Sequence, residues 1–150
     1  MKRVIKHQYF FPHPLETVWE YFTKSELMEL WLMKNNFQPT VGAEFQFRTG
    51  PIPSLDFDGI VYCKVLEIIP YKTLSYSWQS GPGEGKITLD SVVVWTLKQT
   101  DKGTEITLEH SGFEKEVNLA LFNGLNKGWS EKFEKISKLI NASQHGTVNA

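Results

Sequence analysis

The spacing of hydrophobic residues changes after Gly112, and this change constrains the fold more than any single motif. Between residues 41 and 108, apolar and polar residues alternate, as at Leu74, Tyr76 and Trp78, which is typical of strands with one buried face. Beyond Gly112 the spacing becomes helical. One apolar stripe runs through Val117, Leu121, Leu125, Trp129, Phe133, Ile136 and Ile140. The pattern predicts an antiparallel sheet followed by one long amphipathic helix.

The N-terminal part predicts one strand and two short helices. Residues 4–11 are rich in β-branched and aromatic types, and Pro14 suits the first turn of a helix. Ser25 is expected to cap a second helix that carries Trp31. Combined with the later segments, this order predicts an α+β fold.

Within the alternating segment, the turns are predicted from glycine, proline and aspartate. Asp101-Lys102-Gly103 is typical of a tight hairpin, and Pro70-Tyr71 of a turn. One strand face is expected to carry Ile87, Leu89, Val93, Trp95 and Leu97. The glycine- and proline-containing loops at 49–55 and 79–85 are expected to flank the mouth of any cavity, or to be ordinary hairpin connections.

Length and composition favour a single domain without a strongly charged partner. The 150 residues can form one core, and 16 basic against 17 acidic residues give a formal charge of −1, so no net field attracts nucleic acid. Cys63 is the only cysteine and cannot form an internal disulfide. We expect one domain over residues 1–142, a flexible polar tail at 143–150, and a cytoplasmic protein that does not insert into membranes.

The histidines give no sign of a metal site. His7, His13, His110 and His145 fall in separate predicted elements and have no cysteine partner. We therefore expect neither a metal nor a cofactor.

Short motifs occur along the chain in a fixed order. They are Pro14 to Trp19, Trp31, Val41-Gly42 with Phe45, Gly59 with Glu67 and Pro70, Leu74 with Trp78, Gly103-Thr104, His110 to Phe113, and Gly128-Trp129. Their order and spacing resemble the START-like (SRPBCC, Bet v-like) superfamily, and within it the family of homologues of the activator of the heat-shock protein 90 ATPase. The resemblance extends from about Lys6 to Ala142.

This resemblance implies a helix-grip fold. In that fold a curved antiparallel sheet wraps around a long C-terminal helix, two short helices follow the first strand, and a cavity lies between sheet and helix. Eukaryotic co-chaperones of the family pair this domain with a separate chaperone-stimulating domain, for which this chain leaves no room. Chaperone activation is therefore the weaker expectation.

The candidate ligand-binding residues are those expected to face this cavity. They are Phe45, Phe47, Tyr76, Trp78, Trp95, His110, Leu121, Gly124, Leu125 and Gly128. The aromatic residues either line a pocket for a ring-bearing guest or pack in the core. His110 either contacts a ligand or bonds to backbone at the end of its strand. The two helix glycines either leave cavity volume or let the helix cross the sheet closely, or they mark a kink.

Three functions of different classes are open at this stage. The favoured one is a non-catalytic binder of a small hydrophobic or aromatic molecule, which includes a lipid. A protein-interaction or co-chaperone role in the stress response, with a chaperone as partner, would use the apolar residues Leu32, Met33 and Phe37. A cyclase- or hydratase-like enzyme is less favoured, because Asp58, Asp90, Glu105 and Glu109 alternate with the apolar residues and are expected to face water. No catalytic residue is assigned.

Overall fold

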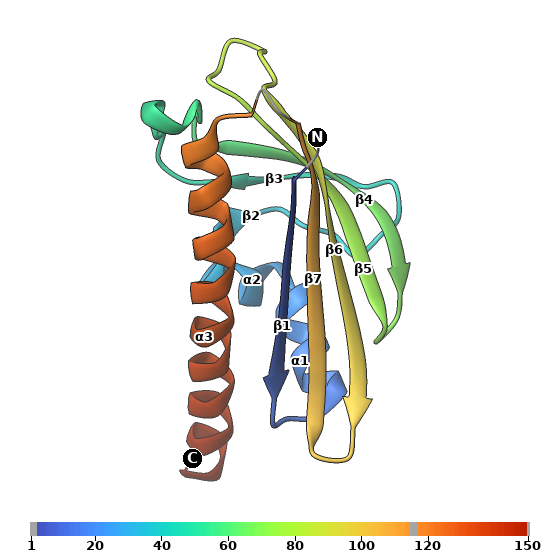
Figure 1. Ribbon diagram of the computed structural model, residues 1–150. Coiled ribbons are helices and arrows are strands. Elements are labelled where there is room, and N and C mark those ends of the chain that lie inside the picture. Colours follow the sequence, from blue (N-terminus) through green and yellow to red (C-terminus); the bar gives the residue numbers. More distant parts are fainter. Residues whose placement is uncertain (1–2, 115–116, 150) are drawn as a thin grey trace.

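The computed structural model describes residues 3–114 and 117–149, with side chains described as far as Ser143. It contains a single seven-stranded sheet in the order β1-β7-β6-β5-β4-β3-β2, and every neighbouring pair is antiparallel (Figure 1). The strands are β1 (Arg3–Phe11), β2 (Lys34–Asn35), β3 (Glu44–Arg48), β4 (Ile60–Ile69), β5 (Thr73–Ser80), β6 (Leu89–Thr100) and β7 (Gly103–Phe113). The helices are α1 (Leu15–Thr23), α2 (Ser25–Trp31), the 3-10 turn η1 (Pro53–Leu55) and α3 (Leu119–Asn149). The predicted α+β helix-grip fold is confirmed.

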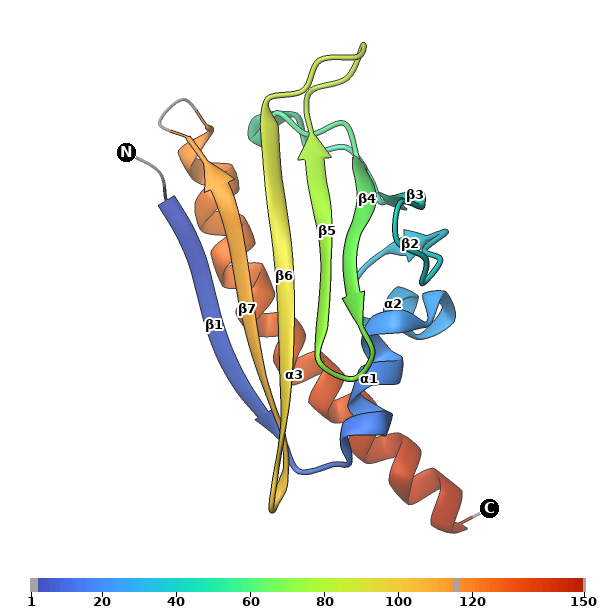
Figure 2. The ribbon, with the colours of Figure 1, turned by 90° about the vertical axis from the view of Figure 1, so that its right-hand side faces the viewer.

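The long helix α3 crosses one face of the curved sheet diagonally (Figure 2). Helices α1 and α2 contact both α3 and the sheet. Almost the whole predicted stripe of α3 is buried, including Trp129, Phe133, Ile136 and Ile140, at no more than 2% exposure each. Leu125 differs, because its side chain is only half-buried. The helix therefore leaves the sheet incompletely covered near Leu125.

Aromatic side chains form the centre of the core. The rings of Phe22, Trp31 and Trp129 lie 4.8, 6.1 and 5.4 Å from the ring of Trp95, so four elements meet at one residue of β6. The indole N–H of Trp95 donates to the Tyr76 hydroxyl at 3.0 Å, and that of Trp31 donates to the Tyr21 carbonyl at 2.8 Å. Large apolar area and satisfied polar tips together fix the positions of these elements.

Several local predictions are confirmed and three are wrong. Val117, predicted to lie on the helical stripe, precedes the helix, because α3 begins at Leu119. Helix α1 begins directly after Pro14, and Asp101-Lys102 joins β6 to β7 in a tight hairpin. Ser25 is not a cap, because it is the first helical residue and its hydroxyl donates to the Asn35 carbonyl at 3.0 Å. Ile87 does not share the buried face of β6, because that strand begins at Leu89 and Ile87 is 42% exposed.

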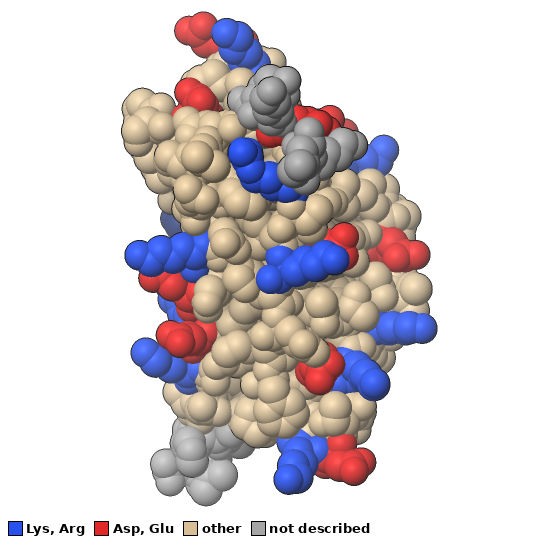
Figure 3. Space-filling view, viewed as in Figure 1, with Lys and Arg blue, Asp and Glu red and all other residues tan. Residues whose placement is uncertain are grey.

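Acidic and basic side chains are interspersed over the face that carries α3 and β1 (Figure 3). No helix in the described part of the chain has an apolar stretch long enough to cross a bilayer. The tail predicted at 143–150 falls almost entirely on side chains outside the described ones, so its flexibility stays a prediction.

Candidate ligand-binding groove beside the C-terminal helix

Two adjoining cavities, of about 190 and 170 Å³, lie beside the first half of α3. Both are lined by Met33, Trp78, Gly124 and Leu125. The first cavity is completed by Ile52, Leu55, Phe57, Val61, Ser80 and Leu121, and the second by Leu32, Gly128, Trp129 and Lys132. Because they share a wall, we treat them as one feature and call it the α3 groove. Its lining is apolar except for the side chains of Ser80 and Lys132.

The space in the groove depends on two glycines of α3. A Cβ atom built on Gly124 or Gly128 would meet no atom within 4 Å. The helix also continues without interruption through both residues (Figure 1). Of the alternatives that the sequence left open, the structure therefore shows open space beside the helix and not a close crossing.

The structure divides the predicted site residues into two groups. One group lines the α3 groove and consists of Trp78, Leu121, Gly124, Leu125 and Gly128. The other group lies in the core, with at most 2% exposure, and consists of Phe45, Phe47, Tyr76, Trp95 and His110. Phe45 also borders a separate, polar cavity of about 490 Å³ over strands β3 to β5. The assignment of all ten residues to a binding site stays a prediction.

His110 is part of a hydrogen-bonded chain that joins α3 to three strands. The indole N–H of Trp129 donates to His110 Nδ1 at 3.1 Å, and His110 Nε2 lies 2.8 Å from Ser91 Oγ. The Ser91 hydroxyl donates to the carbonyl of Trp78 at 2.7 Å. Since an indole can only donate, Nδ1 must be the acceptor and Nε2 must carry the hydrogen. The neutral tautomer therefore satisfies every member of the chain.

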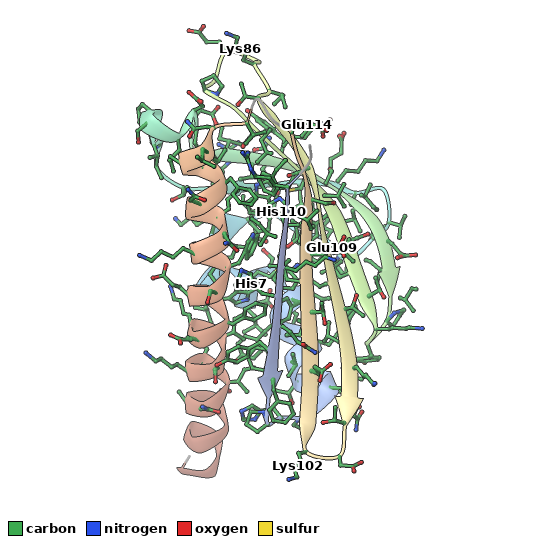
Figure 4. The ribbon with its side chains drawn as sticks, in the orientation of Figure 1. His7, Lys86, Lys102, Glu109, His110 and Glu114 are labelled. Atoms are coloured by element: carbon green, nitrogen blue, oxygen red, sulfur yellow. The ribbon has the colours of Figure 1, made fainter. Side chains whose placement is uncertain are left out.

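The surroundings of His110 also disfavour its charged form. Burial lowers the pKa of His110 to about 3. Figure 4 shows the residue on the side of β7 that faces α3, whereas the adjacent Glu109 is exposed. The sequence suggested a ligand or the backbone as its partner, and the observed partners are the side chains of Ser91 and Trp129.

The buried Cys63 and Tyr76 side chains are uncharged at neutral pH. Burial raises the pKa of the Cys63 thiol and of the Tyr76 hydroxyl, so both stay protonated at neutral pH. Among the described residues that line the α3 groove there is no carboxylate. The groove can therefore surround an apolar molecule, but its described lining offers no acid and base pair for proton transfer.

Several residues of the α3 groove were not among the site residues predicted from the sequence. Ile52 and Leu55 come from the loop that was expected to flank a cavity mouth, and Leu32 and Met33 were assigned to a different function. Lys132 was not among the predicted site residues. The signal that could have found it is its spacing, because Gly124, Gly128 and Lys132 follow one another every four residues and so lie on one helix face.

A curved antiparallel sheet gripping one long helix, with an apolar groove between them, defines a START-like (SRPBCC-like) helix-grip domain. The family described as "Activator of Hsp90 ATPase homolog 1-like protein" matches residues 12–141. The chain belongs to this family, which confirms the resemblance found in the sequence. The fold of this superfamily commonly binds small hydrophobic ligands.

Solved structures agree with this assignment. Protein MLL2253 from Mesorhizobium loti is 37% identical, with a TM-score of 0.81 over 93% of this chain and 97% of that one. Protein BH1534 from Bacillus halodurans is 24% identical, with a TM-score of 0.74 over 93% and 99% of the two chains. The Aha1 dimer from Colwellia psychrerythraea is 16% identical, with a TM-score of 0.74 over 92% and 96% of the two chains. BH1534 and the Aha1 dimer, both less than 25% identical, show likeness of fold alone. A search among curated proteins found no match.

Proposed function

We propose that this protein is a non-catalytic binder that takes a small apolar or amphipathic molecule into the α3 groove. The observation that carries this proposal is the open space in front of Gly124 and Gly128, in a groove whose other walls are almost entirely apolar. Glycine in a helix interior costs roughly 1 kcal/mol relative to alanine. A guest molecule that occupies this open space would account for two such residues in one helix.

The exposed apolar surface of the groove supports the same proposal. Leu32, Met33 and Leu125 are only half-buried, and Ile52 is 41% exposed. A guest that covers them removes apolar area from water, which contributes about 25 cal/mol for each Å² buried. Binding sites for small molecules are generally concave and apolar, with few polar groups, as this groove is.

The alternatives find less support. A cyclase- or hydratase-like enzyme needs acid and base groups inside the cavity, and the lining described above has no carboxylate. For a protein-interaction role the sequence singled out three residues, but Leu32 and Met33 are walls of the groove and Phe37 is 4% exposed. A chaperone partner, a stress-response role and a cytoplasmic location stay predictions.

The proposal is tested first by native mass spectrometry of the freshly purified protein beside a denatured sample. Added mass that disappears on unfolding would identify the class of guest. If no added mass is found, the protein is titrated with 1-dodecanol. The fluorescence of Trp78 and Trp129 is the signal, because both residues line the groove.

The matched variants are Gly128→Leu, which fills the groove, and Ser130→Leu, which adds the same side chain at an exposed position of α3. We expect Gly128→Leu to remain folded and to lose most of the dodecanol binding, whereas Ser130→Leu binds like the wild type. If dodecanol does not bind, or if both variants bind it equally well, the α3 groove is not the binding site.

A further inference from the structure

We infer that the α3 groove is selective for single-chain amphiphiles with an anionic head group, whose head contacts Lys132 and whose chain runs past Gly128 and Gly124. The inference rests on the proposed function and adds the chemical class of the guest. It is argued from the position, burial and partners of Lys132.

Lys132 is unusual among the lysines of this protein. It is half-buried, whereas every other lysine whose side chain the structure describes is exposed. Its side chain forms part of the wall of the second cavity, next to Leu32 and Trp129. A lysine on an exposed helix face normally extends into water, whereas Lys132 is half-buried in a wall that is otherwise apolar.

The ammonium of Lys132 has no carboxylate partner within residues 3–114 and 117–143. By comparison, the exposed Lys24 forms an ion pair with Glu20, one turn away on α1, at 3.3 Å. The neighbours of Lys132 on its own helix are of both signs, since Glu131 and Lys135 lie close to it. A half-buried cation without an ion-pair partner is left incompletely compensated.

The effect of this environment on protonation agrees with that geometry. Burial is the main cause that lowers the pKa of Lys132, Lys135 lowers it further, and Glu131 acts in the opposite direction. An anion bound beside Lys132 would raise its pKa again, because it would supply the missing opposite charge. The protein therefore presents a charge that a guest can complement.

The shape of the groove suits a chain that carries its head at one end. Gly124, Gly128 and Lys132 lie on one face of α3, and the rise of a helix places the first and last of them about 12 Å apart. The wall between them is Leu125, Trp129 and Met33, all apolar. A linear alkyl chain fits along the glycines, and its head then reaches the only charged side chain among the described lining residues.

A different explanation of the same observations predicts a different specificity. The aliphatic stem of Lys132 can simply cover Leu32 and Trp129, in the way that lysine stems often cover apolar surface. In that case the groove would have no preference for the charge of the guest, because the ammonium would remain in contact with water. The two explanations differ in the charge preference of binding, which can be measured.

The test compares three probes with the same alkyl chain, namely dodecanoate, 1-dodecanol and dodecyltrimethylammonium. Each is titrated below the concentration at which it forms micelles, near neutral pH, where the carboxylate is ionised. The variants are Lys132→Met, which keeps an unbranched stem and removes the charge, and Lys127→Met as the control at an exposed position of the same helix.

For the wild type we expect dodecanoate to bind about tenfold tighter than dodecanol, and the cationic probe to bind most weakly. Lys132→Met should lose the preference for dodecanoate while it keeps its affinity for dodecanol, and Lys127→Met should keep the preference. Equal affinity for all three probes, or an unchanged preference in Lys132→Met, would overturn the inference and leave the proposed function standing. Binding of none of the probes would contradict the proposed function as well.

Discussion

Replacing the groove glycines with alanine should make this protein more stable. At Gly124 and Gly128 a Cβ atom meets nothing within 4 Å, and both residues lie in the interior of a helix that extends over Leu119–Asn149. Each substitution should therefore realise nearly the full difference in helix propensity, roughly 0.8–1.0 kcal/mol. The double variant should gain about 2 kcal/mol, which corresponds to a rise in Tm of about 4–8 °C for a domain of this size.

The assay is urea unfolding followed by tryptophan fluorescence, on protein that has been freed of any bound molecule by unfolding and refolding. The free energy of unfolding should rise while the dependence on urea stays the same. Gly112→Ala is the matched control, for which the expected change in the free energy of unfolding has the opposite sign. Gly112 has φ +107°, and its Cβ would lie 2.8 Å from the Asp90 carbonyl oxygen, so the same substitution should destabilise the protein there by about 1–3 kcal/mol.

A neutral or destabilising effect of alanine at both groove positions would refute this reasoning. It would mean that the space in front of the glycines is filled in solution, or that α3 does not continue through them as one helix. A stabilising effect would support the view that this chain gives up stability in order to keep the groove open, as sites of function often do.

Two further predictions concern groups in the core. Because the pKa of His110 is about 3 in the folded protein and an unfolded histidine titrates near 6.5, the unfolded state takes up this proton first, and the free energy of unfolding should fall below about pH 6.5. His110 alone contributes up to about 1.4 kcal/mol per pH unit to this fall. When the free energy of unfolding is measured with urea between about pH 7.5 and 5, it should therefore depend less steeply on pH in His110→Gln than in the wild type. Equal slopes for the two proteins would contradict the lowered pKa of His110. Cys63 is 5% exposed and burial raises the pKa of its thiol, so a thiol-specific reagent should react with it only after unfolding; rapid modification of the native protein would argue against its burial.

The sequence predicted the fold well because its strongest signals were periodic. The stripe from Leu121 to Ile140 specified one face of α3, and the alternation around Tyr76 specified one face of β5. The errors lie where the chain leaves such patterns. The alternation that included Ile87 continued past the actual start of β6, and the short strand β2 (Lys34–Asn35) has too few residues to show any period.

The candidate site was only partly predictable, because facing inward and lining a cavity are different properties. Alternation placed both Trp95 and Trp78 on the inner face, but only Trp78 reaches the α3 groove, since Trp95 is surrounded by Phe22, Trp31 and Trp129. The network of His110 depends on the position of α3 over β7, which no local pattern gives. Residues from the loop that contains η1 enter the groove through tertiary packing alone.

Helix α3 is held on both sides of the groove, at 7% exposed Leu121 and at Trp129, whose indole donates to His110. These two residues are separated by about 12 Å of helix. The wall that α3 provides is therefore rigid and has its final shape before a guest binds. This preorganisation lowers the entropy lost on binding. Part of the opposite wall comes from Met33 and from the segment that includes Ile52 and Leu55, which belongs to no strand of the sheet. Differences in the length or width of an accepted guest should thus be determined by that segment, which can change in sequence without disturbing the core.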